Sequence, residues 1–199
     1  MMGIMLIRHR GHEPIIDPSA YVAPTATLVG RVRIGPRARV MYGAVLDAEE
    51  GAIEVGECAI VCENAVLRGE VRLGDHVFVG PRATLLGCEV ARCAYLATGA
   101  TVLQEAALGA GAVVAVGALV HARTTLPEEF FVPPNTVAVA GRVYAPGDPG
   151  LSEAIRGVEF AKVAFGVDAG WEDRIGRYER IAEVRSAQFA AHADDEIVG

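Results

Sequence analysis

The chain has 199 residues, of which 52% are hydrophobic and 22% charged, a composition typical of one or two globular domains. Its formal net charge of −7 argues against a nucleic-acid partner, because binding to phosphates needs a basic surface. The apolar segment 1–7 is too short for a signal peptide and far too short to cross a bilayer. We therefore expect a cytoplasmic protein with no membrane or nucleic-acid partner.

Residues 1–19 are predicted to form an N-terminal lead-in that precedes the folded core. They contain His9 and His12 at H-x-x-H spacing, which also occurs in metal sites. Charged neighbours such as Arg8 and Glu13 favour a solvated segment instead.

The next region, residues 20–140, is predicted to be one domain, and from Val22 to Val120 it carries an aliphatic residue at every sixth position within each of three phases. The residue two places before each of these positions is also apolar and usually small, as at Ala38, Ala65 and Ala83. The positions at six-residue spacing are Val22, Leu28, Ile34, Val40 and Leu46, then Val55, Val61, Leu67, Leu73, Val79 and Leu85, and finally Val90, Leu96, Val102, Leu108, Val114 and Val120. Beyond Val120 the repeat is expected to fade into irregular chain at 123–135, where three prolines occur.

This period excludes an amphipathic α-helix, because six steps of about 100° each leave no common apolar stripe. In an extended chain, by contrast, residues two and six apart point to the same face. One strand cannot run so far, so the chain must turn after each hexad, and glycines such as Gly35, Gly56 and Gly74 make such turns easy. The pattern therefore predicts an all-β core, a parallel β-helix of hexapeptide repeats.

Two interruptions stand out in the periodic region and after it. The segment Asp47–Ala52 breaks the repeat and predicts a loop thrown out of the coil. Residues 141–150 end in Gly-Asp-Pro-Gly, which predicts a linker.

Residues 151–193 are rich in helix formers and predict two C-terminal α-helices. Ser152 is expected to cap the first helix, which ends at Gly166, and the second begins near Trp171. Both are predicted to pack on the β-helix or on a neighbouring subunit. The tail 194–199 is expected to be frayed.

The four cysteines all lie in the repeat region. Cys88 occupies one of the small-residue positions, which predicts a buried thiol. Cys58 and Cys62 are not accompanied by a second pair at zinc-ribbon spacing, so the cysteines predict no metal site.

The stretch Asn64–Cys88, NAVLRGEVRLGDHVFVGPRATLLGC, resembles the γ-class carbonic anhydrase family, and the similarity extends over about residues 14–140. The acidic loop within Val45–Glu50, the Asp-His-Val-x-Val-Gly segment and the Leu-x-Gly-Cys ending carry the resemblance. It implies a left-handed β-helix with a C-terminal helix, a homotrimer, and a zinc ion held by three histidines at the subunit boundary.

The resemblance assigns the three zinc-ligand positions to Arg68, Pro81 and Leu86. Proline and leucine side chains offer no lone pair, and arginine is a permanent cation that repels the metal. We therefore predict no zinc and no other cofactor. Hydratase activity that depends on a zinc-activated water is expected to be lost.

Other residues that act in the family are also replaced. The family's Arg-Gly-Asp reads Asp47-Ala48-Glu49, and its asparagine and glutamine read Ile60 and Cys62. Because the charge signs are exchanged, Arg68 is expected to pair with a carboxylate of a neighbouring subunit or to hold an anion. The candidate pocket at the subunit boundary comprises Arg68, Asp47, Glu49, Cys62, Glu63 and Leu86.

Three functions remain open at this point. The first is a γ-carbonic-anhydrase-like homotrimer without zinc that acts as a scaffold or binds a small anion or acyl ligand. The second is a hexapeptide-repeat acyltransferase that uses coenzyme A, with His76 or His121 as general base. The third is a carbonic anhydrase with a relocated metal site, to which Asp47, Glu49 and Glu63 could contribute oxygens. We expect His76 at the surface and His121 at the end of the coil.

Overall fold

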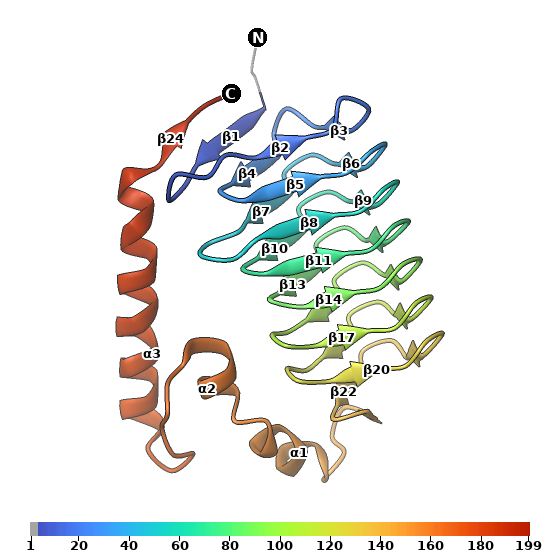
Figure 1. Ribbon diagram of the computed structural model, residues 1–199. Coiled ribbons are helices and arrows are strands. Elements are labelled where there is room, and N and C mark those ends of the chain that lie inside the picture. Colours follow the sequence, from blue (N-terminus) through green and yellow to red (C-terminus); the bar gives the residue numbers. More distant parts are fainter. Residues whose placement is uncertain (1–3) are drawn as a thin grey trace.

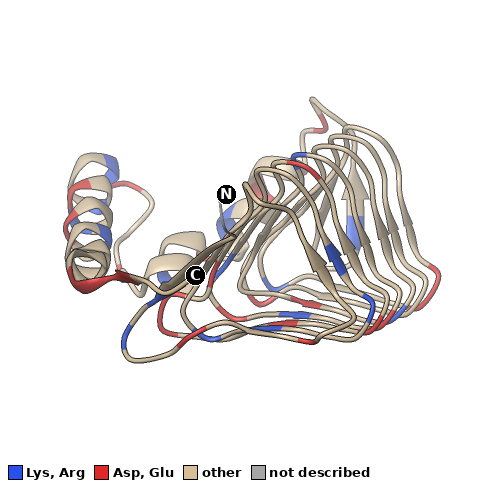
Figure 2. Ribbon diagram, turned by 90° about the horizontal axis from the view of Figure 1, so that it is seen from above, with Lys and Arg blue, Asp and Glu red and all other residues tan. Residues whose placement is uncertain are grey.

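The computed structural model describes residues 4–199, which form a parallel β-helix followed by three α-helices and a final strand (Figure 1). Each coil contributes one short strand to each of three sheets, and strands of successive coils pair in parallel, so the cross-section is a triangle (Figure 2). Leu28 pairs with Leu46, and Val61 with Val79, so one coil contains three hexads. The β-helix predicted from the six-residue period is thereby confirmed.

We name the sheets I, II and III in the order in which each coil visits them. Sheet I has ten strands: β1 (Met5–Arg8), β4 (Thr27–Val29), β7 (Val45–Asp47), β10 (Val66–Arg68), β13 (Thr84–Leu86), β16 (Thr101–Val102), β19 (Leu119–Val120), β22 (Val137–Val139), β23 (Arg142–Tyr144) and β24 (Glu196–Ile197). Sheet II has seven: β2 (Ile15–Ile16), β5 (Val32–Ile34), β8 (Ile53–Val55), β11 (Val71–Leu73), β14 (Glu89–Val90), β17 (Ala107–Leu108) and β20 (Thr125–Leu126). Sheet III also has seven: β3 (Tyr21–Val22), β6 (Arg39–Val40), β9 (Ile60–Val61), β12 (Phe78–Val79), β15 (Tyr95–Leu96), β18 (Val113–Val114) and β21 (Phe131–Val132).

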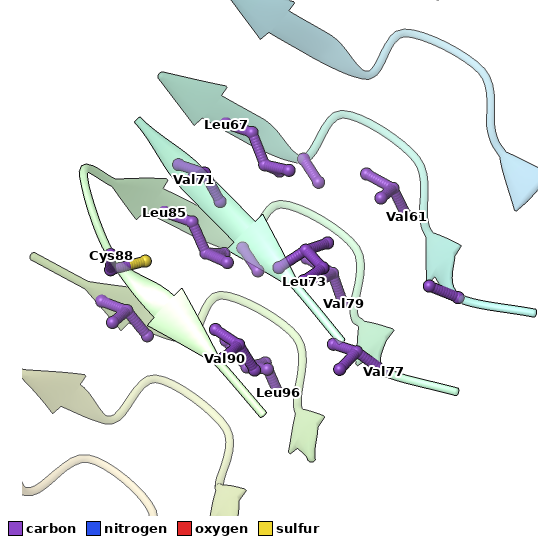
Figure 3. Packing of buried hydrophobic residues seen from close by; sticks show 14 of the residues in the cluster. Val61, Leu67, Val71, Leu73, Val77, Val79, Leu85, Cys88, Val90 and Leu96 are labelled. Carbon is purple, nitrogen blue, oxygen red and sulfur yellow. The ribbon is translucent and has the colours of Figure 1, made fainter. Parts of the chain in front are cut away.

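The periodic aliphatic residues fill the interior of the coil. Leu67, Leu85, Val79 and their equivalents stack in columns along the axis (Figure 3), and none of the seventeen positions at six-residue spacing is more than 5% exposed. Burial of each such side chain contributes about 1.5–3 kcal/mol relative to exposure. The buried thiol predicted at Cys88 is confirmed, since this residue is only 2% exposed.

The β-helix is longer at both ends than its predicted limits of 20 and 140. The prediction that residues 1–19 precede the folded core was wrong for residues 4–19, because β1 and β2 already belong to the first coil. Leu6, for example, pairs with Leu28. The period was hidden by a small antiparallel turn in which the backbones of His9 and His12 pair, and which adds residues between these two strands. The irregular chain expected at 123–135 was also wrong, because β20 and β21 lie there and Leu126 and Val132 continue the buried repeat. At the far end, β23 lies within the predicted linker and pairs antiparallel with β22.

The interruption at residues 47–52 is a compact turn. Five residues (48–52) separate β7 from β8, whereas two (69–70) separate β10 from β11, so three extra residues are inserted here. The amide of Gly51 donates to the carbonyl of Ala48, and Glu49 has a φ of 49°, which folds the insertion against the β-helix. The insertion therefore lies against the coil and does not project from it as the predicted loop would.

The C-terminal region contains the helices α1 (Leu151–Gly157), α2 (Phe160–Phe165) and α3 (Arg174–Phe189), and a 3-10 turn follows at Ala190–Asp194. The first expected helix is thus two helices, because Glu159 adopts a left-handed φ of 52°. Ser152 was wrong as the cap, since the N-cap is Gly150 and no side chain caps this helix. Asp173 caps α3 by accepting a hydrogen bond from the amide of Gly176.

The tail predicted to be frayed is instead ordered against the first coil. α3 runs back along one side of the β-helix (Figure 1), and β24 then pairs antiparallel with β1, with Ile7 opposite Ile197. No helix among residues 4–199 combines the length and the apolar character needed to cross a membrane.

The outer faces of the three sheets differ in chemistry. On sheet II, Arg33, Glu54, Arg72 and Glu89 follow one another in register with alternating charge, and Figure 2 shows charged residues along this side of the triangle. The corresponding column on sheet III is mostly apolar: Tyr21, Arg39, Ile60, Phe78, Tyr95, Val113 and Phe131. The outer face of sheet II is therefore suited to contact with solvent, whereas that of sheet III presents an apolar column.

Candidate functional site

A charged pair occupies the corner between sheets I and II. Asp47 ends β7, Arg68 ends β10 and Leu86 ends β13, and the three are direct register partners in successive coils. Leu67 points into the core, so its neighbour Arg68 points outward because side chains alternate along a strand. The parallel ladder thus places the Arg68 side chain between those of Asp47 and Leu86.

The contacts of Arg68 are electrostatic. Its Nε lies 3.6 Å from Asp47 Oδ2 and 3.6 Å from Glu49 Oε1, too far for good hydrogen bonds but close enough for ion pairs. Nε is buried and has no hydrogen-bond partner among residues 4–199. The Asp47 side chain is 7% exposed, and its carboxylate accepts a hydrogen bond of 3.0 Å from the amide of Glu49. Both partners predicted for Arg68 are therefore present, but they come from its own chain rather than from a neighbouring subunit.

The end of α3 covers this charged pair. Arg185 donates to Glu49 Oε1 at 2.6 Å, so Glu49 interacts with two arginines. The Phe189 ring centroid lies 5.3 Å from Cζ of Arg68 and 4.3 Å from Cζ of Arg185, both within cation–π range. We call Asp47, Glu49, Arg68, Arg185 and Phe189 the charge cluster. It joins the insertion after β7 to the C-terminal helix.

Next to the charge cluster, two histidines share one carboxylate. His9 Nδ1 lies 2.5 Å from Asp195 Oδ1, and His192 Nδ1 lies 2.9 Å from Asp195 Oδ2. Burial alone raises the pKa of Asp195, but the hydrogen bonds from His192 and His9 outweigh it, so that pKa lies below its ordinary value. His9 is only 2% exposed, which contradicts the solvated segment predicted for it. We call His9, His192 and Asp195 the C-terminal latch.

The nitrogen and oxygen atoms of the latch lie close enough together for a metal to be considered. The two imidazole rings, however, are stacked, with centroids 4.4 Å apart and planes inclined by 23°. An imidazole nitrogen binds a metal in the plane of its ring, and two stacked rings do not share such a position. The arrangement fits two hydrogen bonds to one carboxylate better than a shared ion.

The zinc positions implied by the resemblance do not fit that metal either. Arg68 and Leu86 stand side by side, and Pro81 lies at a different corner, between β12 and β13. A guanidinium, an isobutyl group and a pyrrolidine ring offer no donor for zinc.

A pocket of about 320 Å³ lies beside the charge cluster and the latch. Its walls include Glu49, Glu50 and Glu70 but only one arginine, Arg10, which is paired with Glu50 at 2.8 Å. Arg68 does not line it. The acidic walls argue against a small anion as its ligand.

The predicted pocket residues separate into two groups within one chain. Asp47, Glu49, Arg68 and Leu86 lie at the corner between sheets I and II. Cys62 and Glu63 lie at the corner between sheets III and I, at the opposite end of the sheet I strands, where the implied ligand position Pro81 also lies. Cys62 is buried, and burial raises the pKa of its thiol, with Glu63 adding to the effect. A single chain therefore does not assemble the whole predicted pocket.

The two histidines considered as general bases also lie in different surroundings. His76 is exposed in the turn between β11 and β12, as expected for a surface residue. His121 is 7% exposed and follows β19, beneath α2, where its ring meets Phe160 edge-on at 5.5 Å. It lines a second cavity of about 550 Å³, formed with α1, α2 and α3.

Sequence reasoning missed the residues that come from the C-terminal region, namely Arg185, Phe189, His192 and Asp195. A signal was present in the apolar residues Ile197 and Val198 near the end of the tail, which is unusual for a frayed terminus. Nothing in the sequence, however, indicates which part of the β-helix this tail contacts.

Comparison with known proteins finds a partial similarity to γ-class carbonic anhydrases. It is 35% identical to "Gamma carbonic anhydrase 1, mitochondrial" of Arabidopsis thaliana over 138 residues, which covers 61% of this chain and 50% of the relative. It is 40% identical to "Gamma carbonic anhydrase 3, mitochondrial" of the same plant over 112 residues, covering 48% of this chain and 43% of the relative. The chain thus spans half or less of the length of these relatives.

A solved structure supports the fold. The crystal structure of a hexapeptide transferase family protein from Anaplasma phagocytophilum superposes with a TM-score of 0.65 and 23% identity, covering 94% of this chain and 99% of that one. No protein-family model matches the chain. The repeat, the coiled sheets and the curated relatives agree with the left-handed β-helix expected from the resemblance. The chain has the hexapeptide-repeat β-helix fold and is similar in sequence to γ-class carbonic anhydrases over part of its length.

Proposed function

We propose that this protein is a homotrimeric scaffold of the γ-carbonic-anhydrase type in which the charge cluster replaces the zinc site, without zinc-dependent hydratase activity. The observation that carries the proposal is Arg68, which stands at the first ligand position and contacts the carboxylates of Asp47 and Glu49. A guanidinium fixed between two carboxylates cannot activate a water molecule as zinc does. It can hold the insertion after β7 and the C-terminal helix in place.

Between the two versions of this proposal, the contacts favour pairing over anion binding. The Arg68 charge is already offset by two carboxylates, and the adjacent pocket has acidic walls. An added anion would be repelled by Asp47 and Glu49 before it reached the guanidinium.

The outer faces support assembly of this chain with copies of itself. Tyr95 and Phe131 on sheet III are 46% and 55% exposed, and they continue the apolar column described above. A heterologous contact between sheet III of one subunit and sheet I of the next would close into a ring of three. Such a ring would bring the corner with Cys62, Glu63 and Pro81 to the corner with Arg68 and Leu86 of the neighbour.

Elemental analysis and a histidine-restored variant test the loss of zinc together. Protein produced in zinc-supplemented medium without a metal-binding tag should contain less than about a tenth of an equivalent of zinc per chain. The triple variant Arg68→His, Pro81→His, Leu86→His should gain zinc, because the ring supplies three imidazoles at each boundary. Near-stoichiometric zinc in the unchanged protein, together with hydratase activity, would overturn the proposal and favour a relocated metal site.

Light scattering tests the assembly. The unchanged protein should have the mass of three chains. Tyr95→Arg should dissociate it, because the new charge must be buried in the contact. Glu89→Arg, on the charged face of sheet II, is the matched control and should remain trimeric. If the unchanged protein had the mass of one chain, the proposed homotrimer would be wrong.

A second candidate function is acyl transfer with His121 as general base. Burial lowers the pKa of His121, which keeps the imidazole neutral near pH 7, the form required of a base. A thermal-shift titration with acetyl-coenzyme A is the test. Stabilisation at millimolar ligand, with acetyl transfer that is lost in His121→Asn but not in His76→Asn, would favour this function, and no shift would count against it.

A further inference from the structure

The larger cavity is enclosed by the C-terminal helices and the far end of sheet I. It measures about 550 Å³, within the usual range for small-molecule sites. Its apolar walls come from α1, α2, α3 and the connection between them: Ile155, Phe160, Phe165, Val167, Trp171, Tyr178 and Ile181. The residues of the charge cluster and the latch do not line it.

One buried cation faces this cavity. Arg177 on α3 is only 4% exposed, and its guanidinium stacks on Trp171 at 4.5 Å and on Tyr178 at 5.1 Å. Within residues 4–199 no ion pair or hydrogen bond joins its guanidinium to a carboxylate. The stacked rings hold the guanidinium by its faces and leave its N–H edge free.

The other charged groups around the cavity do not compensate this cation. Arg156, Glu159, Lys162 and Asp168 also line the cavity, but all four are exposed to solvent at its rim. Burying an uncompensated charge is costly, and an anion that enters the cavity would remove that cost.

A second polar group in the cavity lacks a partner. Nδ1 of His121 is buried and forms no hydrogen bond with any part of residues 4–199, whereas its backbone amide donates to Ala138. The cavity is therefore lined by two groups, the Arg177 guanidinium and the His121 imidazole, to which a bound ligand could offer polar atoms.

We propose that this cavity binds an amphiphilic carboxylate, an alkyl chain that ends in a carboxylate group. The alkyl part lies against Phe160, Phe165 and Ile181, and the carboxylate receives hydrogen bonds from the N–H edge of Arg177. This site is separate from the charge cluster, so a test of it neither supports nor contradicts the proposed scaffold function.

Trp171 provides the measurement, because it is the single tryptophan of the chain and lies against Arg177. Decanoate, titrated below its micelle concentration, should change the tryptophan fluorescence saturably. Decanol, which has the same alkyl chain without the charge, should bind at least about tenfold more weakly, a difference of about 1.4 kcal/mol. His121→Phe should also weaken decanoate binding.

Arg177→Met is the decisive variant and Arg174→Met is its control, since Arg174 lies on the same helix but is exposed and outside the cavity. Arg177→Met should lose the preference for decanoate over decanol while still binding decanol, which shows that the cavity is intact. Arg174→Met should behave like the unchanged protein.

Three results would overturn the proposal. The first is equal affinity for decanoate and decanol in the unchanged protein. The second is an equal loss in Arg174→Met and Arg177→Met. The third is a fluorescence that responds to protein concentration and not to decanoate, with light scattering showing that a second chain covers the cavity.

Discussion

Arg68 and Asp47 face each other across two adjacent parallel strands, with 3.6 Å between Nε and Oδ2 and the carboxylate almost fully buried. Because Asp47 is buried, removal of the cation that offsets its charge should destabilise the folded protein. Arg68→Met should lower the free energy of unfolding by about 1–3 kcal/mol, less than for a fully buried pair because the Arg68 side chain is 36% exposed. Urea unfolding measures the change.

Arg72→Met is the matched control for Arg68→Met. Arg72 pairs with Glu70 and Glu89 at 2.8 and 2.9 Å, but its side chain is 53% exposed. Its replacement should cost less than about 1 kcal/mol. The double variant Asp47→Leu, Arg68→Met should lose less stability than the sum of the two single changes. Strict additivity would show that the pair does not interact.

The C-terminal latch should respond to acid in a defined direction. The pKa of Asp195 in the folded protein lies below its ordinary value of 3.8, so its carboxylate stabilises the fold fully above pH 3.8. That contribution should disappear as the pH falls from 3.8 through the lower folded value. Asp195→Asn should therefore be less stable than the unchanged protein at pH 7 and should show a shallower loss below pH 3.8. Thermal unfolding between pH 7 and about pH 3 measures both effects.

Asp194→Asn serves as the control for the latch, because Asp194 is exposed and forms no ion pair within the described residues. It should follow the pH dependence of the unchanged protein. If Asp195→Asn followed it as well, the latch would not contribute to stability.

Glycine is required where successive coils approach most closely. A Cβ added at Gly74 would lie 2.6 Å from the backbone nitrogen of Arg92 in the next coil. Gly74→Ala should cost about 1–3 kcal/mol, because neither backbone can move without separating the coils. At Gly157, the last residue of α1, a Cβ meets no atom within 4 Å, so Gly157→Ala should be neutral or stabilising by up to about 1 kcal/mol. Similar losses in the two variants would contradict this account.

The cysteines should react with iodoacetamide in a fixed order. Cys93 is exposed, whereas burial raises the pKa of Cys88 to about 12 and shields its sulfur from the reagent. Peptide mass spectrometry should find Cys93 alkylated in the folded protein and Cys88 alkylated only after unfolding. Early labelling of Cys88 would mean that the coil opens at this position.

The core of this fold could be predicted from the sequence because its information is local and repeated. Each aliphatic residue at six-residue spacing, such as Leu67 or Leu85, specifies its own coil without reference to distant parts of the chain. The first coil was missed for a physical reason. The turn between His9 and His12 adds residues that the period does not contain, although Leu6 still pairs with Leu28.

The candidate site was predicted only in part, because half of it depends on long-range contacts. The pairing of Arg68 with Asp47 and Glu49 followed from the exchange of charge signs, but its location within one chain did not. His9 was expected in solvent because its neighbours Arg8 and Arg10 are charged. It is buried because Asp195 approaches it from the other end of the chain, and no local pattern encodes that approach.

The return of the C-terminal tail to β1 also bears on how the molecule unfolds. In a simple solenoid each coil contacts only its neighbours, so the terminal coils can fray independently and unfolding can spread inward from either end. Here the C-terminal segment starts at the last coil, where α1 contacts β22, and ends on the first coil, where β24 pairs with β1. The two ends of the solenoid are therefore connected by contacts as well as by the stacked coils. Neither end is free to open first, and loss of the first coil requires α3 to detach as well. Cooperativity in this protein therefore comes from its ends as much as from its stacked interior.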